Sequence, residues 1–223
     1  MGVERLLPKW KVSSKIYREL KSLTRERQRL VENKTAVKNQ LHAEKHTAHP
    51  MKTVITRIKN HIKYLERQIA SIEKELENKV SKDDFVSKKI KKITTIPGIA
   101  FVTAVTVVSE TQGFDNFTSS RQLSSFAGYD IRLKESGKFK GKTKISKKGN
   151  SHIRRAMYMP SLSTIGHTKT YKKIYNRLYK KKENGLIAGT AIQRKLLGLI
   201  YTLWKNDTPF IDKYDSKKVC QKN

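Results

Sequence analysis

Apolar positions between residues 16 and 76 form two stripes with the seven-residue spacing of paired helices. Arg27 and Lys34 interrupt the first stripe, and Pro50 separates it from the second, which is continuous. We predict a coiled-coil helical hairpin over residues 13–85. Because such a seam usually buries itself on another helix, we predict dimerisation through it; packing on the rest of the chain is the alternative. The stripes are Ile16, Leu20, Leu23, Leu30, Val37, Leu41 and Ile58, Ile62, Leu65, Ile69, Ile72, Leu76.

The remaining pattern predicts a mainly α protein. An arm (1–12) precedes the hairpin, a compact helical C-terminal domain (86–205) follows it, and a flexible tail (206–223) ends the chain. Residues 101–110 read as a buried helix, with a strand as the alternative because they are rich in β-branched side chains.

Turn and cap residues divide this second domain into short elements. Pro97-Gly98 predicts a turn, Ser119-Ser120 cap a short helix that ends at Gly128, and Asn150 caps a longer one. Pro160 should kink or break that longer helix, because proline lacks the N–H of a helical hydrogen bond. Asn184-Gly185 separates the next helix from a final buried helix over residues 186–204.

The net charge of the chain indicates which class of partner it binds. The chain has 49 Lys and Arg against 19 Asp and Glu, a net charge of +30, and a pI of about 10.2. Such a chain repels itself unless a polyanion neutralises it. Nucleic acid is the first candidate, since Lys and Arg displace counterions from phosphates, and an acidic membrane surface is the second.

Other features of the sequence argue against several classes of protein, namely disulfide-rich, cysteine–zinc, secreted and membrane-spanning proteins. Cys220 is the only cysteine, which excludes an intrachain disulfide framework and a cysteine zinc site. The N-terminal residues contain no apolar signal segment, and Arg194 and Lys195 interrupt the most apolar stretch, which argues against a membrane span. We therefore expect a soluble, cytoplasmic, nucleoid-associated protein of prokaryotic type.

Two segments are candidates for phosphate contact. The turn Ile96-Pro97-Gly98-Ile99 resembles a helix-hairpin-helix element, although Ala100 stands where a second glycine is usual; a tight turn between helices is the alternative. Residues 129–149 form a loop or short hairpin rich in lysine and glycine. The predicted nucleic-acid-binding residues are Pro97, Gly98, Arg132, Lys134, Gly137, Lys138, Lys140, Lys142, Lys144, Lys147, Lys148, Asn150, Arg154 and Arg155.

Catalytic side chains are sparse. Ser136 lies in the basic loop, but a serine is a weak nucleophile without a base, cation or metal, and no base is visible beside it. Arg154 and Arg155 can hold a phosphate bidentately, or form only the basic first turn of a solvated helix. His42, His46 and His49 have helical spacing but lack further ligands, and no cluster of carboxylates suits two-metal chemistry. No metal is therefore assigned to this chain.

An ordered series of motifs resembles the C-terminal domain of Piv-type transposases of insertion-sequence family 110. Residues 10–42 are similar to the segment that enters the coiled coil of that family, so the resemblance covers nearly the whole chain. The motifs are Ile96-Pro97-Gly98-Ile99, Phe126-Ala127-Gly128-Tyr129, Ser136-Gly137-Lys138-Phe139-Lys140-Gly141, Ile145-Ser146-Lys147-Lys148-Gly149-Asn150 and Ile153-Arg154-Arg155-Ala156.

The resemblance implies a DNA recombinase that moves or inverts DNA segments. Family members combine a RuvC-like domain, whose four acidic residues hold metal, with a serine that attacks the DNA backbone; by position that serine is Ser136. It also implies a structured guide RNA in many members, oligomers formed through the coiled coil, and Mg²⁺ bound only by the acidic domain.

The sequence differs from the family pattern at three points, and these differences leave two hypotheses about its function. Lys134 replaces a residue common before the serine motif, Pro160 interrupts a usually unbroken helix, and the RuvC-like domain should precede Trp10, where only nine residues stand. We expect either a component of a serine transposase that works with an acidic domain elsewhere, or an inactive fragment that only binds DNA or RNA and dimerises. A basic structural RNA-binding protein of ribosomal type is a weaker third interpretation.

Overall fold

The computed structural model describes residues 14–132, 135–136, 139–140 and 144–211, and within them the chain is mainly helical, which confirms the predicted fold class. The predicted arm and most of the predicted tail lie outside these residues. The helices are α1 (Lys15–Lys45), α2 (Lys52–Ser81), α3 (Asp84–Ile93), α4 (Phe101–Glu110), the short η1 (Gln112–Phe114), α5 (Ser120–Phe126), α6 (Ser151–His167), α7 (Lys169–Lys182) and α8 (Gly185–Asn206).

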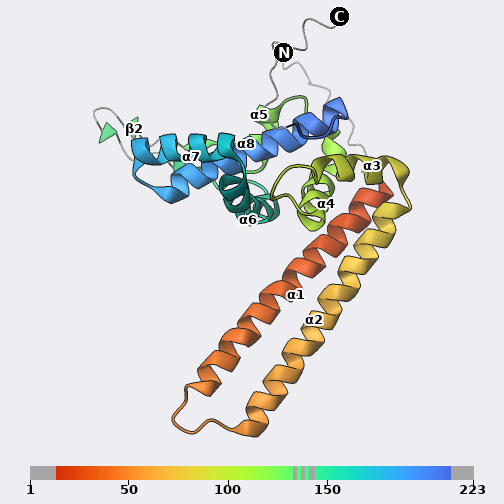
Figure 1. Cartoon of the computed structure of the whole chain (residues 1–223), viewed down its shortest axis with the longest axis vertical. Helices are drawn as coiled ribbons and strands as arrows, with labels where there is room; N and C mark the ends of the chain where they lie inside the picture. The colour runs from red at the N-terminus through yellow and green to blue at the C-terminus, as the bar shows by residue number, and fades with distance from the viewer. Residues whose placement is uncertain (1–13, 133–134, 137–138, 141–143, 212–223) are drawn as a thin grey trace, which may run out of the picture.

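Helices α1 and α2 lie antiparallel and extend as a long rod from the body formed by the other helices (Figure 1). Away from the body, Val37 of α1 is buried against Ile62 and Leu65 of α2. Near the body, Leu20 and Leu76 join the main core instead. The apolar stripes are thus buried at least in part within the chain itself, and dimerisation through the hairpin stays a prediction.

Helix α8 forms the centre of the body, with α3, α5, α6 and α7 packed around it. Its residues Ile192, Leu196 and Ile200 are fully buried. Helix α4 lies between α1 and α6 and buries Val105 and Val108 completely. The β-branched segment 101–110 is therefore a helix rather than the alternative strand, because packing on several sides outweighs its modest helix propensity.

Side-chain caps begin four of the helices. Ser119 accepts a hydrogen bond from the Gln122 backbone, and Asn150 accepts one from the Ile153 backbone, which confirms both predicted caps. Asp83 caps α3 and Asn184 caps α8 in the same way. Such caps satisfy backbone N–H groups that have no partner inside the helix.

Pro160 was predicted to kink or break its helix, and the break is wrong, because α6 runs without interruption through this residue to His167. Thr164 donates a side-chain hydrogen bond to the Pro160 carbonyl at 2.8 Å and to the Pro97 carbonyl at 2.6 Å. Pro160 is buried, and α6 packs on both α4 and α8. This packing offsets the one helical hydrogen bond that proline cannot donate.

None of the helices in the described ranges is both long and apolar enough to cross a membrane.

Candidate nucleic-acid interface

The basic loop, residues 129–149, contains two short antiparallel strand pairs. Strand β1 (Ile131–Arg132) pairs with β4 (Lys144–Ile145), and β2 (Glu135–Ser136) pairs with β3 (Phe139–Lys140). The described residues of this segment thus form short strands rather than a helix, in agreement with the loop or short hairpin expected from the sequence. Ser136 faces Phe139 in the register of the β2–β3 pair, and β2 lies outside the body of helices in Figure 1.

The C-terminal end of the basic loop is fastened to the end of α5 and to the turn that follows it. The Lys147 N–H donates to the Gly128 carbonyl at 3.1 Å, and the Asn150 N–H donates to the Phe126 carbonyl at 2.8 Å. Tyr129 is buried and donates its hydroxyl to Gln193 of α8 at 3.0 Å. Burial raises the pKa of Tyr129, so the phenol stays protonated and keeps this hydrogen bond. The base of the loop is therefore fixed while Ser136 is exposed.

The Ser136 hydroxyl forms no hydrogen bond with any side chain that the structure describes. Lys147 and Lys148 are exposed at the base of the loop. Several other predicted binding residues fall outside the described part: Lys134, Gly137, Lys138 and Lys142 in their placement, and Arg132, Lys140 and Lys144 in their side chains. Their contact with nucleic acid, like the role of Ser136, stays a prediction.

The structure gives three of the predicted phosphate ligands other partners. Arg154 donates to the carbonyls of Ala127 at 2.8 Å and Gly149 at 3.2 Å, so it clamps the base of the loop. Arg155 pairs with Glu32 of α1. Asn150 donates its amide to Glu110 while its oxygen caps α6. The side chains of the basic first turn of α6 therefore contact other groups of the chain, and their contact with phosphate stays a prediction.

Gly98 also has a structural role. Its φ of +90° is favourable for glycine alone, and an added Cβ would lie 2.9 Å from the Thr164 hydroxyl and 3.0 Å from the Pro160 carbonyl. The turn after α3 is therefore packed against α6, as the tight-turn alternative requires. Phosphate contact by Pro97 and Gly98 stays a prediction.

A buried carboxylate joins the hairpin to the base of the loop. The Glu110 side chain is 0% exposed and accepts hydrogen bonds from Arg25 of α1 at 2.7 and 3.1 Å and from Asn150 at 2.7 Å. Lys21 lies 3.5 Å away. Burial by itself opposes ionisation, but the hydrogen bonds from Arg25 and Asn150 and the two positive charges outweigh it and lower the pKa of Glu110.

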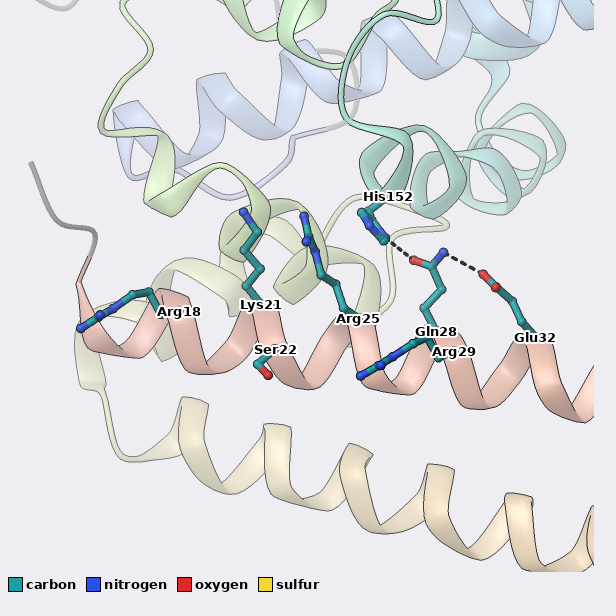
Figure 2. Close-up of a pocket in the computed structure, with 8 residues that line it drawn as sticks. All are labelled: Arg18, Lys21, Ser22, Arg25, Gln28, Arg29, Glu32 and His152. Carbon is teal, nitrogen blue, oxygen red and sulfur yellow. Dashed lines mark hydrogen bonds between the residues drawn. The ribbon is translucent and has the colours of Figure 1, made fainter. Parts of the chain in front are cut away.

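A shallow concavity of about 610 Å³, here the α1 groove, lies over this junction (Figure 2). Its cations are Arg18, Lys21, Arg25 and Arg29, and its other lining residues are Ser22, Gln28, Glu32 and His152. Figure 2 shows Lys21 and Arg25 pointing from α1 towards the body. Lys21 and Arg25 contact Glu110, and Arg29 pairs with Glu26. Three of the four cations therefore already contact carboxylates, and two of the three share Glu110.

His152 completes the wall of the α1 groove. Gln28 donates its amide N–H to Glu32 at 2.9 Å, which turns its oxygen towards Nδ1 of His152 at 2.7 Å (Figure 2). The ring nitrogen is therefore the donor in this contact. Burial, together with the charges of Arg25 and Lys21, lowers the pKa of His152 despite the opposing charge of Glu110. A neutral imidazole that holds Gln28 contributes to the helix junction.

Comparison with known protein families gives a match for part of this chain. Residues 90–176 match the model of the transposase IS116/IS110/IS902 family. We call residues 90–176 the transposase segment, because they are similar to this family. The transposase segment includes α4, α5, the basic loop, α6 and most of α7, and therefore both Ser136 and the residues that fasten the loop.

Similar proteins include recombination proteins of two kinds. The chain is 32% identical over 104 residues to the transposase for insertion sequence element IS1328 of Yersinia enterocolitica, which covers 47% of this chain and 30% of that protein. It is 28% identical over 120 residues to the pilin gene-inverting protein of Moraxella bovis, 53% of this chain and 37% of that protein. The transposase for IS1111A of Coxiella burnetii is 32% identical over 79 residues, 35% of this chain and 22% of the relative. The chain thus spans about a third of the length of these relatives.

Sequence reasoning missed the ionic junction between the transposase segment and the hairpin. Arg25 and Glu110 are separated by 85 positions and belong to different patterns, so no local signal links them. Glu110 was the one sequence signal for this junction, because it is an acidic residue at the end of a strongly apolar helix. A buried carboxylate needs a partner, and this chain has far more cations than acids.

The histidines of the hairpin do not form a metal site in the described residues. The rings of His42 and His46 lie 4.4 Å apart, but the described part of the chain holds no group of three or more His, Cys, Asp or Glu suited to a metal ion.

Proposed function

We propose that this chain acts in DNA transposition or inversion, with Ser136 as the nucleophile. The observation that carries this proposal is the transposase segment itself, which includes an exposed serine on a basic loop whose base is fixed to the body. The Ser136 Oγ attacks the phosphorus of a DNA phosphodiester while its proton passes to a base. The bond to one deoxyribose oxygen breaks, and that oxygen leaves protonated. The product is a covalent serine–phosphate link to DNA.

The charge of the chain supports binding to DNA. Phosphates release counterions when Lys and Arg replace them, and a net charge of +30 favours this exchange at every basic surface. We extend the proposal to the other partners that the family resemblance implies, namely a guide RNA and further copies of the chain that meet through α1 and α2.

The described residues do not fit a Mg²⁺ site. They contain no group of three or more metal-ligating side chains, and their buried carboxylate, Glu110, is occupied by Arg25, Lys21 and Asn150. We therefore propose that the acidic domain implied by the resemblance supplies the metal from outside these residues. No step of the reaction is assigned to metal ligands on this chain.

The direct test is to trap the serine–phosphate link. The full chain is mixed with labelled DNA from the ends of its insertion sequence, Mg²⁺, a separately supplied acidic domain and any guide RNA. We expect a protein–DNA species that survives detergent and is removed by protease. Ser136→Ala should abolish it.

Ser125→Ala is the matched control, because Ser125 is also exposed and lies on α5 near the base of the loop. It should form the adduct at the rate of the unaltered chain. An adduct that persists in Ser136→Ala would show that another residue is the nucleophile. Retained DNA binding with no adduct in any protein would leave the chain as a binding module.

A further inference from the structure

A second concavity lies between α5, α7 and α8 and has a volume of about 660 Å³. We call it the α8 groove. Four cations line it: Arg121 from α5, Arg177 from α7, and Arg194 and Lys195 from α8. All four side chains belong to exposed residues. Three helices that are far apart in sequence therefore bring positive charge to one hollow of the surface.

The floor of the α8 groove consists of small residues on one face of α8. Ala191, Arg194, Lys195 and Gly198 follow the i, i+3, i+4, i+7 spacing of a single helical face. A Cβ at Gly198 would lie 2.8 Å from the Ser120 hydroxyl, so glycine here lets α5 approach α8 closely. The small residues create the depth, and the two cations between them supply the charge.

Among the described residues, no carboxylate balances the charges of the α8 groove. No Asp or Glu lines it, and no carboxylate of the described residues lies within 4.0 Å of any of its four cations. The α1 groove differs, because three of its four cations contact carboxylates. Clustered like charges repel one another, so their assembly in a hollow favours a bound polyanion.

Helix α7 extends this positive surface. Its sequence contains seven Lys and Arg residues and no acidic residue. Lys173 and Lys180 are exposed and lie four residues before and three residues after Arg177, on the same side of the helix. A ligand with regularly repeated negative charge can therefore contact the groove and continue along α7.

We propose that the α8 groove binds the phosphodiester backbone of a nucleic-acid duplex, at a site separate from the Ser136 loop. The proposal rests on the proposed function only in its choice of nucleic acid as the polyanion. Arginine and lysine contact phosphate oxygens without reading bases, so binding here is independent of sequence. Arg177, Arg194 and Lys195 all lie beyond the transposase segment, which ends at residue 176.

The test replaces all four groove cations by glutamine in the full chain: Arg121→Gln, Arg177→Gln, Arg194→Gln and Lys195→Gln. The matched control replaces four exposed cations of α2 that have no carboxylate within 4.0 Å in the described residues: Arg57→Gln, Lys59→Gln, Lys63→Gln and Arg67→Gln. Both variants lose the same net charge. Circular dichroism and thermal unfolding check that both keep the fold.

Affinity for DNA and RNA duplexes of unrelated sequence is measured by fluorescence anisotropy from low to high salt. We expect the groove variant to bind at least one duplex roughly tenfold or more weakly than the control. The slope of log affinity against log salt should become shallower by about 0.9 for each phosphate of B-form DNA that the variant no longer neutralises. The DNA and RNA arms then identify which duplex the groove holds.

Equal losses of affinity in the two variants, for both the DNA and the RNA duplex, would overturn the proposal that the α8 groove binds a duplex. The proposed function would remain intact. Failure of the unaltered chain to bind either duplex at low salt would overturn both. A second measurement needs no variant: bound duplex should protect Lys195 from acetylation while leaving Lys59 and Lys63 of α2 reactive. Undiminished acetylation of Lys195 at saturating duplex would also contradict the proposal.

Discussion

The α1 groove and the α8 groove have nearly the same charge content and opposite chemical environments. Each has four cations, but the α1 groove contains Glu32 and lies over Glu110, whereas no acidic residue lines the α8 groove. In the first groove, ion pairs hold the hairpin against α4 and α6. In the second groove, the cations are accessible to a ligand. A cluster of basic residues therefore does not define a binding site until the partners of each charge are known.

The largest expected difference in stability is between a substitution of Arg25 in the α1 groove and a substitution of Arg194 in the α8 groove. Arg25→Gln should lower the free energy of unfolding by about 3 kcal/mol, because it leaves the fully buried carboxylate of Glu110 without its strongest partner. Arg194→Gln should change it by less than about 0.5 kcal/mol, since Arg194 is exposed and has no carboxylate partner among the described residues. Urea unfolding at pH 7 measures both. Equal losses would contradict the contrast between the grooves.

Removing the carboxylate of Glu110 should lower the free energy of unfolding less than removing the cation of Arg25. Glu110→Gln should lower the free energy of unfolding by about 1.5 kcal/mol, because a neutral amide still accepts hydrogen bonds, while the side chain of Arg25, 43% exposed, can be hydrated. The matched control is Glu26→Gln, which removes an exposed ion pair with Arg29 and should cost less than about 1 kcal/mol. A larger loss in Glu26→Gln than in Glu110→Gln would show that the buried junction is not the stronger contact.

Acid should weaken the junction of the α1 groove. The pKa of Glu110 is lower in the folded chain than its ordinary value of 4.5, so the folded state binds this proton less readily than the unfolded state. The stabilisation is complete above about pH 4.5 and is lost as the pH falls through the folded pKa. Urea unfolding between pH 7 and pH 3 should show a steeper acid loss in the unaltered chain than in Glu110→Gln. Parallel curves would mean that Glu110 does not titrate as described.

The smallest expected effect tests the floor of the α8 groove. Gly198→Ala should change the free energy of unfolding by less than about 1 kcal/mol, because improved helix propensity offsets the contact with the Ser120 hydroxyl. It should still weaken duplex binding a few-fold, roughly 0.5–1 kcal/mol, by filling the floor. Gly189→Ala is the control on the same helix, where an added Cβ meets nothing within 4 Å. Equal affinities of the two variants would contradict a ligand that reaches the floor.

The elements of the fold were predictable where a local rule decides them. Apolar periodicity identified the hairpin arms, and the capping residues Ser119 and Asn150 marked helix starts correctly. Asn184-Gly185 correctly marked the break before α8. The predicted break at Pro160 is wrong, since Pro160 is buried and the packing of α6 on α4 and α8 outweighs the local cost of proline. Long-range packing was decisive there, and no window of the sequence contains it.

The candidate site was predictable in its location rather than in its contacts. The glycines and lysines of residues 129–149 identified an exposed basic loop, which the structure confirms at Ser136, Lys147 and Lys148. Phosphate contact by Arg154 was predicted from its chemistry and stays a prediction, while its hydrogen bonds to the carbonyls of Ala127 and Gly149 were not foreseen. Residue type determines what a side chain can bind, while its neighbours determine what it does bind.

By itself, the sequence determined the helical class, two of the cap positions, the large excess of positive charge and the resemblance to family 110 transposases. These properties depend on residue type and on short spacings, which are fixed by the covalent chain. Only the tertiary structure decided which charges are neutralised, because Coulomb and hydrogen-bond energies depend on distance in space. The same packing that brings Arg25 to Glu110 leaves Arg177, Arg194 and Lys195 together without a carboxylate among the described residues.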